Sequence, residues 1–286
     1  MPFRAVSCWA AAVLVLLSAR AQAGEIDTEH LFGFMIGSDV GDVGEREFES
    51  RFTGRAGKAG GRYRAATQEF EVEFVPAKNF RVELGTTLAS HDIGGVPGLD
   101  DRRQLGWQGL TVDLRYRLLD RVNARFGMTF AVETKAGRIA TSSGLPARSV
   151  GTEFTVAFDR ELVPGQLVAA LNLLYEPEWT RLVGSLAVER DSTIGVAAAL
   201  MAQIRPGLLL GGEMRYLRSY EGFGLQEFSG DALFVGPTAY LQLTPGSWMA
   251  AAWSMQAWGS RAGEGGSLNL AGFERHQARL IYGINF

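Results

Sequence analysis

The sequence has 286 residues, a formal net charge of −3, 47% hydrophobic residues, 36 glycines and one cysteine. Without a basic excess, nucleic acid is excluded as the expected partner. Beyond the first 23 residues, no uninterrupted apolar run reaches the length of about 18 residues that a membrane-spanning helix needs.

The first 23 residues have the pattern of a signal peptide. A basic start at Met1–Arg4 is followed by the apolar run Val6–Ser18 and by the small-residue motif Ala21-Gln-Ala23. We predict that residues 1–23 are removed on export. Cys8 is lost with them, so the mature chain is expected to hold no thiol and no disulfide.

Residues 24–44 precede the first expected strand and contain the run His30-Leu-Phe-Gly-Phe34 followed by several glycines. This segment is predicted either to lie across the periplasmic mouth of the fold or to enter it as a small plug. Its acids Asp39, Asp42 and Glu45 fit the spacing of neither an EF-hand nor an RTX repeat, so ordinary turns are expected and no metal site is predicted.

Short clusters of turn-forming residues recur about every 40 residues, a period typical of repeated hairpins. Each interval holds two alternating strands, so five turns join six hairpins, and residues 45–286 are predicted to form a twelve-stranded antiparallel barrel. A β-propeller has a similar period but needs four short strands per blade, which makes it the second choice. The turns fall at Pro76–Asn79, Leu119–Asn123, Val163–Gln166, Arg205–Gly207 and Thr244–Ser247.

The connections at the other end of the hairpins are longer and polar. Short turns at one end and long loops at the other are typical of outer-membrane barrels, whose long loops are extracellular. The extracellular loops are expected at Asp92–Leu105, Thr134–Ser149, Tyr220–Asp231 and Gly259–Gly266.

Along most strands, apolar residues alternate with charged ones. Phe70, Val72 and Phe74, for example, alternate with Glu69, Glu71 and Glu73. Successive side chains point to opposite faces of a strand, so one face is apolar and the other polar. The strands at about 232–243 and 248–258 carry small apolar residues on both faces, and their outward side stays unassigned.

If the apolar face meets lipid, the charged side chains line the lumen. Acids concentrate on the first three strands and arginines on the fourth and the last, from which we predict oppositely charged walls facing each other. The predicted lumen-lining residues are Glu47, Glu49, Arg51, Glu69, Glu71, Glu73, Arg81, Glu83, Asp113, Arg115, Arg117, Arg125, Glu153, Asp159, Glu213, Arg215, Arg275 and Arg279.

Catalytic signals are weak in this chain. Ser90-His91-Asp92 is the only stretch similar to a hydrolase site, and neighbouring residues of a strand point to opposite faces, so Ser90 and His91 are not expected to pair. His276 has the parity of the outward set. We therefore predict no enzyme, no catalytic residue and no cofactor.

The last strand is apolar at every second position up to the terminal aromatic residue, at Leu280, Tyr282, Ile284 and Phe286. An exposed edge strand of this kind invites aggregation, so it is expected to close the barrel by pairing with the first strand. The segment resembles the C-terminal strand of Gram-negative outer-membrane β-barrel proteins. In that family the strand is the assembly signal read by the insertion machinery, which implies a location in the bacterial outer membrane.

The expected function is a passive, narrow channel for small polar or charged solutes. The charged residues either line a wet pore or close it by pairing with one another. A closed structural or interaction barrel and an outer-membrane lipid or peptide hydrolase are the alternatives. The expected partners are outer-membrane lipid, the insertion machinery and small polar solutes.

Overall fold

The computed structural model describes residues 26–264 and 266–286, in which twelve strands form one closed antiparallel barrel. The predicted fold class is confirmed, while the predicted signal peptide lies outside the described residues. The strands are β1 (Arg46–Ala56), β2 (Arg62–Ala77), β3 (Phe80–Gly94), β4 (Arg102–Leu119), β5 (Gly127–Ile139), β6 (Pro146–Val163), β7 (Leu167–Leu182), β8 (Glu189–Arg205), β9 (Leu208–Glu221), β10 (Glu227–Thr244), β11 (Ser247–Arg261) and β12 (His276–Asn285).

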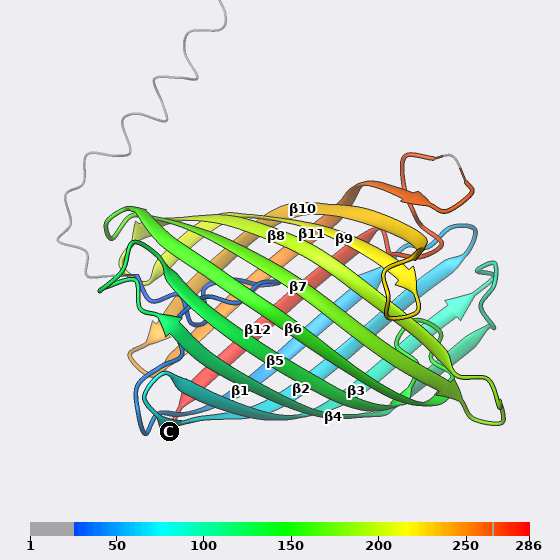
Figure 1. The fold of residues 1–286 in the computed structure, drawn as a ribbon, viewed down its shortest axis with the longest axis horizontal. Helices are drawn as coiled ribbons and strands as arrows, with labels where there is room; N and C mark the ends of the chain where they lie inside the picture. Colours follow the sequence, from blue (N-terminus) through cyan, green and yellow to red (C-terminus); the bar gives the residue numbers. More distant parts are fainter. Residues whose placement is uncertain (1–25, 265) are drawn as a thin grey trace, which may run out of the picture.

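The barrel closes through the pairing of its first and last strands (Figure 1). In this ladder Phe48 lies opposite Ile284 and Phe52 opposite Leu280. β12 also pairs with β11, so both of its edges are covered by neighbouring strands. Closure removes the exposed edge that the terminal strand would otherwise present.

The predicted short turns lie together at one end of the barrel, which is also where the C-terminus lies (Figure 1). We call this the periplasmic end. The β2–β3 turn consists of residues 78–79, with Asn79 in the left-handed conformation at a φ of 64°. The remaining turns are formed by residues 120–126, 164–166, 206–207 and 245–246.

At the opposite, extracellular end, most connections are shorter than predicted. β3 continues to Gly94 and β4 already begins at Arg102, so much of the expected loop Asp92–Leu105 is strand. The expected loops at 134–149 and 220–231 are shortened in the same way, because cross-strand pairing continues through polar residues. The long connection is the one between β11 and β12, across residues 262–275.

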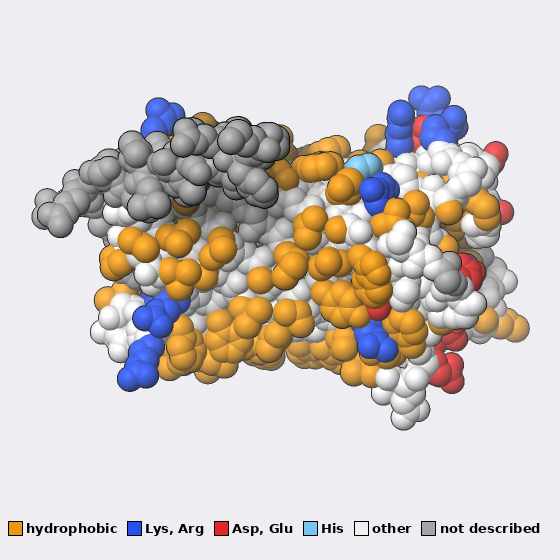
Figure 2. Space-filling view, turned by 90° about the horizontal axis from the view of Figure 1, so that it is seen from above, with side chains coloured by type: hydrophobic (Ala, Val, Ile, Leu, Met, Phe, Trp, Pro, Cys, Tyr) orange, Lys and Arg blue, Asp and Glu red, His pale blue; other side chains and the backbone are white. Residues whose placement is uncertain are grey.

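The outer surface carries the apolar face of the strands. The side chain of Leu110 is 55% exposed and that of Leu280 45%, whereas Glu71 and Arg81 on the inner face are each 1% exposed. Figure 2 shows hydrophobic side chains over the middle of the cylinder and charged ones gathered toward its two ends. The apolar outer band fits the hydrocarbon of a bilayer, and the polar inner face fits a hydrated lumen.

Residues 26–44 run inside the cylinder in its periplasmic half (Figure 1, dark blue). We call them the N-terminal segment. They form no strand, and they occupy the lumen before the chain enters β1 at Arg46. No helix within residues 26–264 and 266–286 is long and apolar enough to cross a membrane.

Candidate functional site in the barrel lumen

One side of the N-terminal segment is apolar and packs against apolar residues on the inner wall, three of them alanines. Leu31 and Phe32, 1% and 3% exposed, belong to one buried cluster with Ile26 and Met35. The wall residues of this cluster are Val168, Ala170, Ala197, Ala199, Met201 and Leu209, from β7, β8 and β9. The alanines of this wall leave the space that the segment fills.

Polar side chains of the barrel hold the backbone of the segment. The Glu213 carboxylate accepts hydrogen bonds from the backbone N–H groups of Gly33, at 2.6 Å, and Phe34, at 2.9 Å. The Asn172 amide donates to the Ile36 carbonyl at 3.1 Å. These side chains satisfy backbone groups that would otherwise be buried without partners.

Asp159 and two arginines hold other parts of the segment. The Asp159 carboxylate accepts hydrogen bonds from the Ser38 N–H at 2.6 Å and from the Thr28 hydroxyl at 2.6 Å. The guanidinium groups of Arg215 and Arg279 lie over the Phe34 ring, 3.9 and 4.7 Å from its centroid. Such contacts are attractive because the ring face carries partial negative charge.

The other side of the segment meets a buried ion network on β1–β4. Arg51 contacts Glu49 at 3.0 Å, Glu69 at 3.3 Å and Glu71 at 2.8 Å. Arg115 contacts Glu83 at 3.0 Å and Asp113 at 2.9 Å. Each guanidinium is shared among several carboxylates, so negative charge is in excess in this part of the lumen.

Arg81 connects this network to the segment. Its guanidinium lies 2.7 Å from Glu29 of the N-terminal segment, 3.3 Å from Glu73 and in contact with Glu83. All four side chains are at most 3% exposed. The segment is thereby joined to the charged wall as well as to the apolar one.

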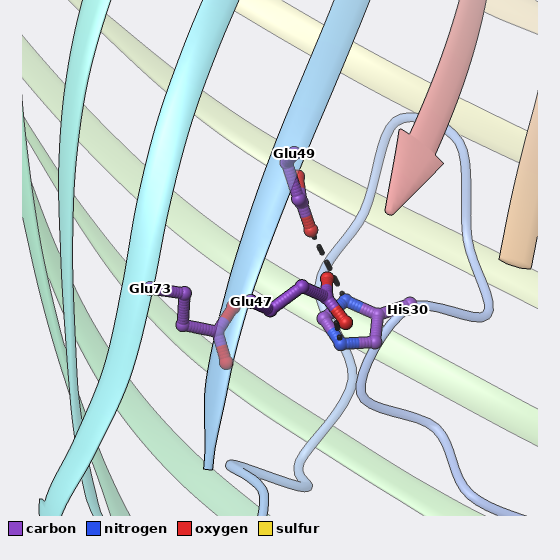
Figure 3. A group of neighbouring side chains, drawn as sticks. All are labelled: His30, Glu47, Glu49 and Glu73. Atoms are coloured by element: carbon purple, nitrogen blue, oxygen red, sulfur yellow. Dashed lines mark ion pairs between the residues drawn. The ribbon is translucent and has the colours of Figure 1, made fainter. Parts of the chain in front are cut away.

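His30 sits among carboxylates where the segment meets β1 and β2 (Figure 3). Its ring stacks on Trp248 with centroids 4.2 Å apart. Burial acts to lower the pKa of the His30 imidazole, but the neighbouring carboxylates, first among them Glu29 and Glu49, outweigh it and raise that pKa to about 10. The distances are 3.2 Å to Glu49, 3.5 Å to Glu47 and 3.7 Å to Glu29.

All the predicted lumen residues that lie on strands point into the barrel, and the other two, Arg125 and Arg275, lie outside the strands. Arg125 is exposed in the β4–β5 turn, and Arg275 lies just before β12, where its guanidinium donates to the Gln256 carbonyl at 2.6 Å. The fully buried ones are Glu47, Glu49, Glu69, Glu71, Glu73, Arg81, Glu83, Asp113, Arg115, Asp159 and Glu213. The partly buried ones are Arg51, Arg117, Glu153, Arg215 and Arg279.

The prediction of oppositely charged facing walls is wrong. β4 and β12 lie on the same side of the barrel as the acidic strands, because the strand order around this side is β12, β1, β2, β3, β4. Acids and arginines therefore alternate within one wall and pair there. The wall formed by β7 and β8 carries Val168, Ala170, Ala197 and Ala199 instead.

Several residues of the site were not predicted. Glu29 and His30 belong to a segment without periodicity, and Trp248 and Asn172 stand among small or apolar residues. The one sequence signal was the polar pair Glu29-His30 directly before the apolar run Leu31–Phe34, which fits a segment lying between two unlike walls.

The acids of the glycine-rich stretch make ordinary contacts. Asp39 lies 2.6 Å from Arg121 and accepts a hydrogen bond from the Thr28 N–H at 3.0 Å. Glu45 accepts hydrogen bonds from the Asp42 N–H at 2.9 Å and the Asn285 amide at 2.7 Å.

Ser90, His91 and Asp92 do not come together. His91 is 2% exposed inside the barrel, with Nε2 2.9 Å from the Thr141 carbonyl. Asp92 pairs with Arg62 at 3.1 Å on the exposed rim. His276 stacks on the exposed Trp253 with ring centroids 5.7 Å apart.

The terminal strand presents its predicted signal residues outward. Ile284 is 40% and Phe286 71% exposed, while the Phe286 N–H donates to the Arg46 carbonyl at 3.0 Å. Their role in assembly stays a prediction.

Comparison with known proteins places this fold among outer-membrane barrels. Residues 24–286 match a family of unknown function (DUF6662). Among curated proteins, none matches the chain.

Among solved structures, the COG4313 outer membrane channel from Pseudomonas putida F1 aligns with a TM-score of 0.61 and 12% identity, covering 92% of this chain and 100% of that chain. The β domain of the Bordetella autotransporter BrkA aligns with a TM-score of 0.51 and 15% identity, covering 86% of this chain and 100% of that chain. The predicted resemblance to outer-membrane β-barrels is confirmed, and the fold agrees with the predicted location in the bacterial outer membrane.

Proposed function

Since the chain belongs to the DUF6662 family and has the fold of outer-membrane barrels, we propose that it is an outer-membrane channel for small polar or charged solutes. In this proposal the N-terminal segment narrows the periplasmic half of the channel. The aligned Pseudomonas putida protein is named an outer membrane channel, which agrees with the proposal.

The observation that carries the proposal is open space beside charged side chains of the inner face. Lys135 shares the inward face of β5 with the buried Thr129 and Ala131, and yet its side chain is 51% exposed. Its partner Glu133, 2.6 Å away, is 20% exposed. Exposure on an inward face indicates a lumen that is wet at this level.

The width of the barrel also supports the proposal. Barrels of about eight strands are filled by their own side chains, whereas about sixteen leave an aqueous channel. Here a stretch of backbone with its side chains fits inside the cylinder, between the small residues of β7 and β8 and the acids of β1–β3. Displacement of the segment would vacate the space between these two walls and widen the proposed channel.

Planar-bilayer recordings test this function. Purified, refolded wild type is expected to give small unitary currents, and deletion of residues 27–42 is expected to increase the unitary conductance. Val43→Ala, at a residue 63% exposed where the segment leaves the lumen, should behave as wild type.

A closed structural or interaction barrel is the second candidate, favoured by the buried ion network that joins the segment to the wall. It would be supported, and the channel rejected, by the absence of unitary current from both wild type and the deletion variant when circular dichroism shows both folded.

A further inference from the structure

His30 and three carboxylates converge at the junction between the N-terminal segment and the barrel wall. Glu47 and Glu49 come from β1 and Glu73 from β2 (Figure 3). Each of the four residues offers one nitrogen or oxygen atom, and these atoms lie within 4.8 Å of one another. The group combines two strands with a segment that is not part of the sheet.

Two oxygens of this group are buried without a hydrogen bond. Among the described residues, Glu47 Oε1 and Glu73 Oε2 have no hydrogen-bond partner, although Glu47 is 1% and Glu73 2% exposed. Trp248 Nε1 donates to Glu47 Oε2 at 2.9 Å. This hydrogen bond fixes the carboxylate so that Oε1 points at His30 Nε2, 3.5 Å away.

The positive charge nearby is divided among more carboxylates than it can neutralise. Arg81 is shared by Glu29, Glu73 and Glu83. Arg51 forms ion pairs with Glu49, Glu69 and Glu71. Buried carboxylates without full compensation are costly, and a bound cation is one way to offset that cost.

We propose that the N-terminal segment is fastened by a divalent transition-metal ion bound by His30 Nε2 and the carboxylates of Glu47 and Glu73; the ion displaces the Nε2 proton of the imidazolium, which is released to solvent. Glu49, 3.2 Å from His30 Nδ1, accepts a hydrogen bond from the N–H of that ring nitrogen and orients the imidazole. A carboxylate behind a metal-binding histidine fixes both the tautomer and the direction of the ring.

The donor set selects the class of metal. An imidazole with carboxylates suits zinc and related first-row ions, whereas magnesium and calcium prefer oxygen ligands throughout. Ligands at about 2.1 Å from zinc stand roughly 3.4 Å apart, so rotations of the glutamate side chains would bring the three protein ligands into place, with water in the fourth tetrahedral position.

Zinc binding to the purified, refolded full chain after chelator treatment tests the site. Isothermal titration and metal analysis are expected to find one Zn²⁺ per chain in wild type and none in His30→Ala. Glu47→Gln, a second ligand variant, should also lose stoichiometric uptake. Glu49→Gln should weaken binding by about 10- to 100-fold, as removal of an outer-shell partner does.

The matched control is His91→Ala, which removes another buried histidine, 2% exposed, on β3 near the extracellular end. This variant should take up zinc as wild type does. A second readout is tryptophan fluorescence, since Trp248 touches both His30 and Glu47; zinc should change the wild-type emission and leave that of Trp248→Phe unchanged.

The inference is overturned if folded wild type takes up no zinc, or if His30→Ala retains the same uptake as His91→Ala. In either case the group is an ion-paired imidazolium. Neither outcome bears on the channel, because conductance is measured independently of zinc.

Discussion

Arg81 is the residue at which the N-terminal segment and the barrel wall depend on each other most. Its side chain is 1% exposed and contacts Glu29 of the segment together with Glu73 and Glu83 of β2 and β3. A buried ion pair is not strongly stabilising in itself, because both charges lose their hydration. Removing one partner of a buried pair is strongly destabilising, because the remaining charge stays buried without compensation.

We therefore expect Arg81→Gln to lower the free energy of unfolding by about 3–5 kcal/mol. Urea unfolding of the refolded barrel in detergent micelles measures it. The matched control is Arg62→Gln, because Arg62 pairs with Asp92 on the exposed rim, with side chains 59% and 34% exposed. Exposed pairs contribute about 0–1 kcal/mol. Equal losses in the two variants would contradict the structural role assigned to Arg81.

At the scale of the element, the N-terminal segment fits against β11 because residue 33 is a glycine. A Cβ atom added to Gly33 would lie 2.2 Å from the Cβ of Ala252, and the next atom, the Ala252 Cα, would be 3.4 Å away. The first distance is a severe overlap, while the second is an ordinary contact. The conflict therefore rests on one methyl group.

Gly33→Ala is expected to push the segment away from the wall and expose Phe32 and Phe34 to chymotrypsin. The double variant Gly33→Ala/Ala252→Gly should restore protection, because it removes the overlapping methyl group. Limited proteolysis of the refolded proteins measures the cleavage rate. Val43→Ala serves as control. If the single variant is as protected as wild type, the segment is not held where the structure has it.

A substitution in the terminal strand can show whether its last side chain contributes to stability or to assembly. Phe286 is 71% exposed, so its ring contributes little packing, and its backbone hydrogen bond to Arg46 does not depend on the side chain. We expect Phe286→Ala to change the free energy of unfolding by less than about 1 kcal/mol, as an exposed substitution does. Its yield in the outer membrane should nevertheless fall, because the aromatic terminus is the expected assembly signal. Immunoblots of membrane fractions measure the yield; a parallel loss of stability and yield would contradict a signalling role.

The strands could be predicted from sequence because their pattern is local. Phe70, Val72 and Phe74 against Glu69, Glu71 and Glu73 define both a strand and its two faces. The outward sides of β10 and β11 could not be assigned, since small apolar residues such as Ala232 and Ala250 occupy inward positions that a charged lumen would not require. On β8 the inward alanines Ala197 and Ala199 have a reason that the sequence did not reveal, because they make room for the segment.

The candidate site itself was largely hidden from the sequence. Glu47, Glu49 and Glu73 were expected in the lumen, but the partner that brings them together is His30, on a segment with no periodic pattern. Its position depends on contacts between residues far apart in the chain, such as Gly33 with Glu213. Contacts between residues so far apart in the chain produce no regular spacing in the sequence, so they could not be predicted from it.

At the scale of the whole molecule, the lumen is asymmetric across its width and along its length. Acids and arginines pair on the β1–β4 side, while apolar packing holds the segment on the β7–β9 side. Toward the extracellular end, Glu133 and Lys135 are partly exposed, and Glu153 and Glu176 lie on the neighbouring strands β6 and β7. In the proposed channel, the charges at this level are the ones that would act on a passing ion.

Ion selectivity should follow the charges at this level, and removal of opposite charges should shift it in opposite directions. Lys135→Gln removes the positive charge beside Glu133, so the reversal potential under a KCl gradient should move toward cation preference. Glu153→Gln/Glu176→Gln should move it toward anion preference. The control is Lys78→Gln, which removes an exposed lysine from the β2–β3 turn. It should leave the reversal potential unchanged, because this charge lies outside the lumen. Shifts of the same sign in the lysine and glutamate variants would show that the current does not pass these side chains, because a path lined by them must respond to the sign of the charge removed.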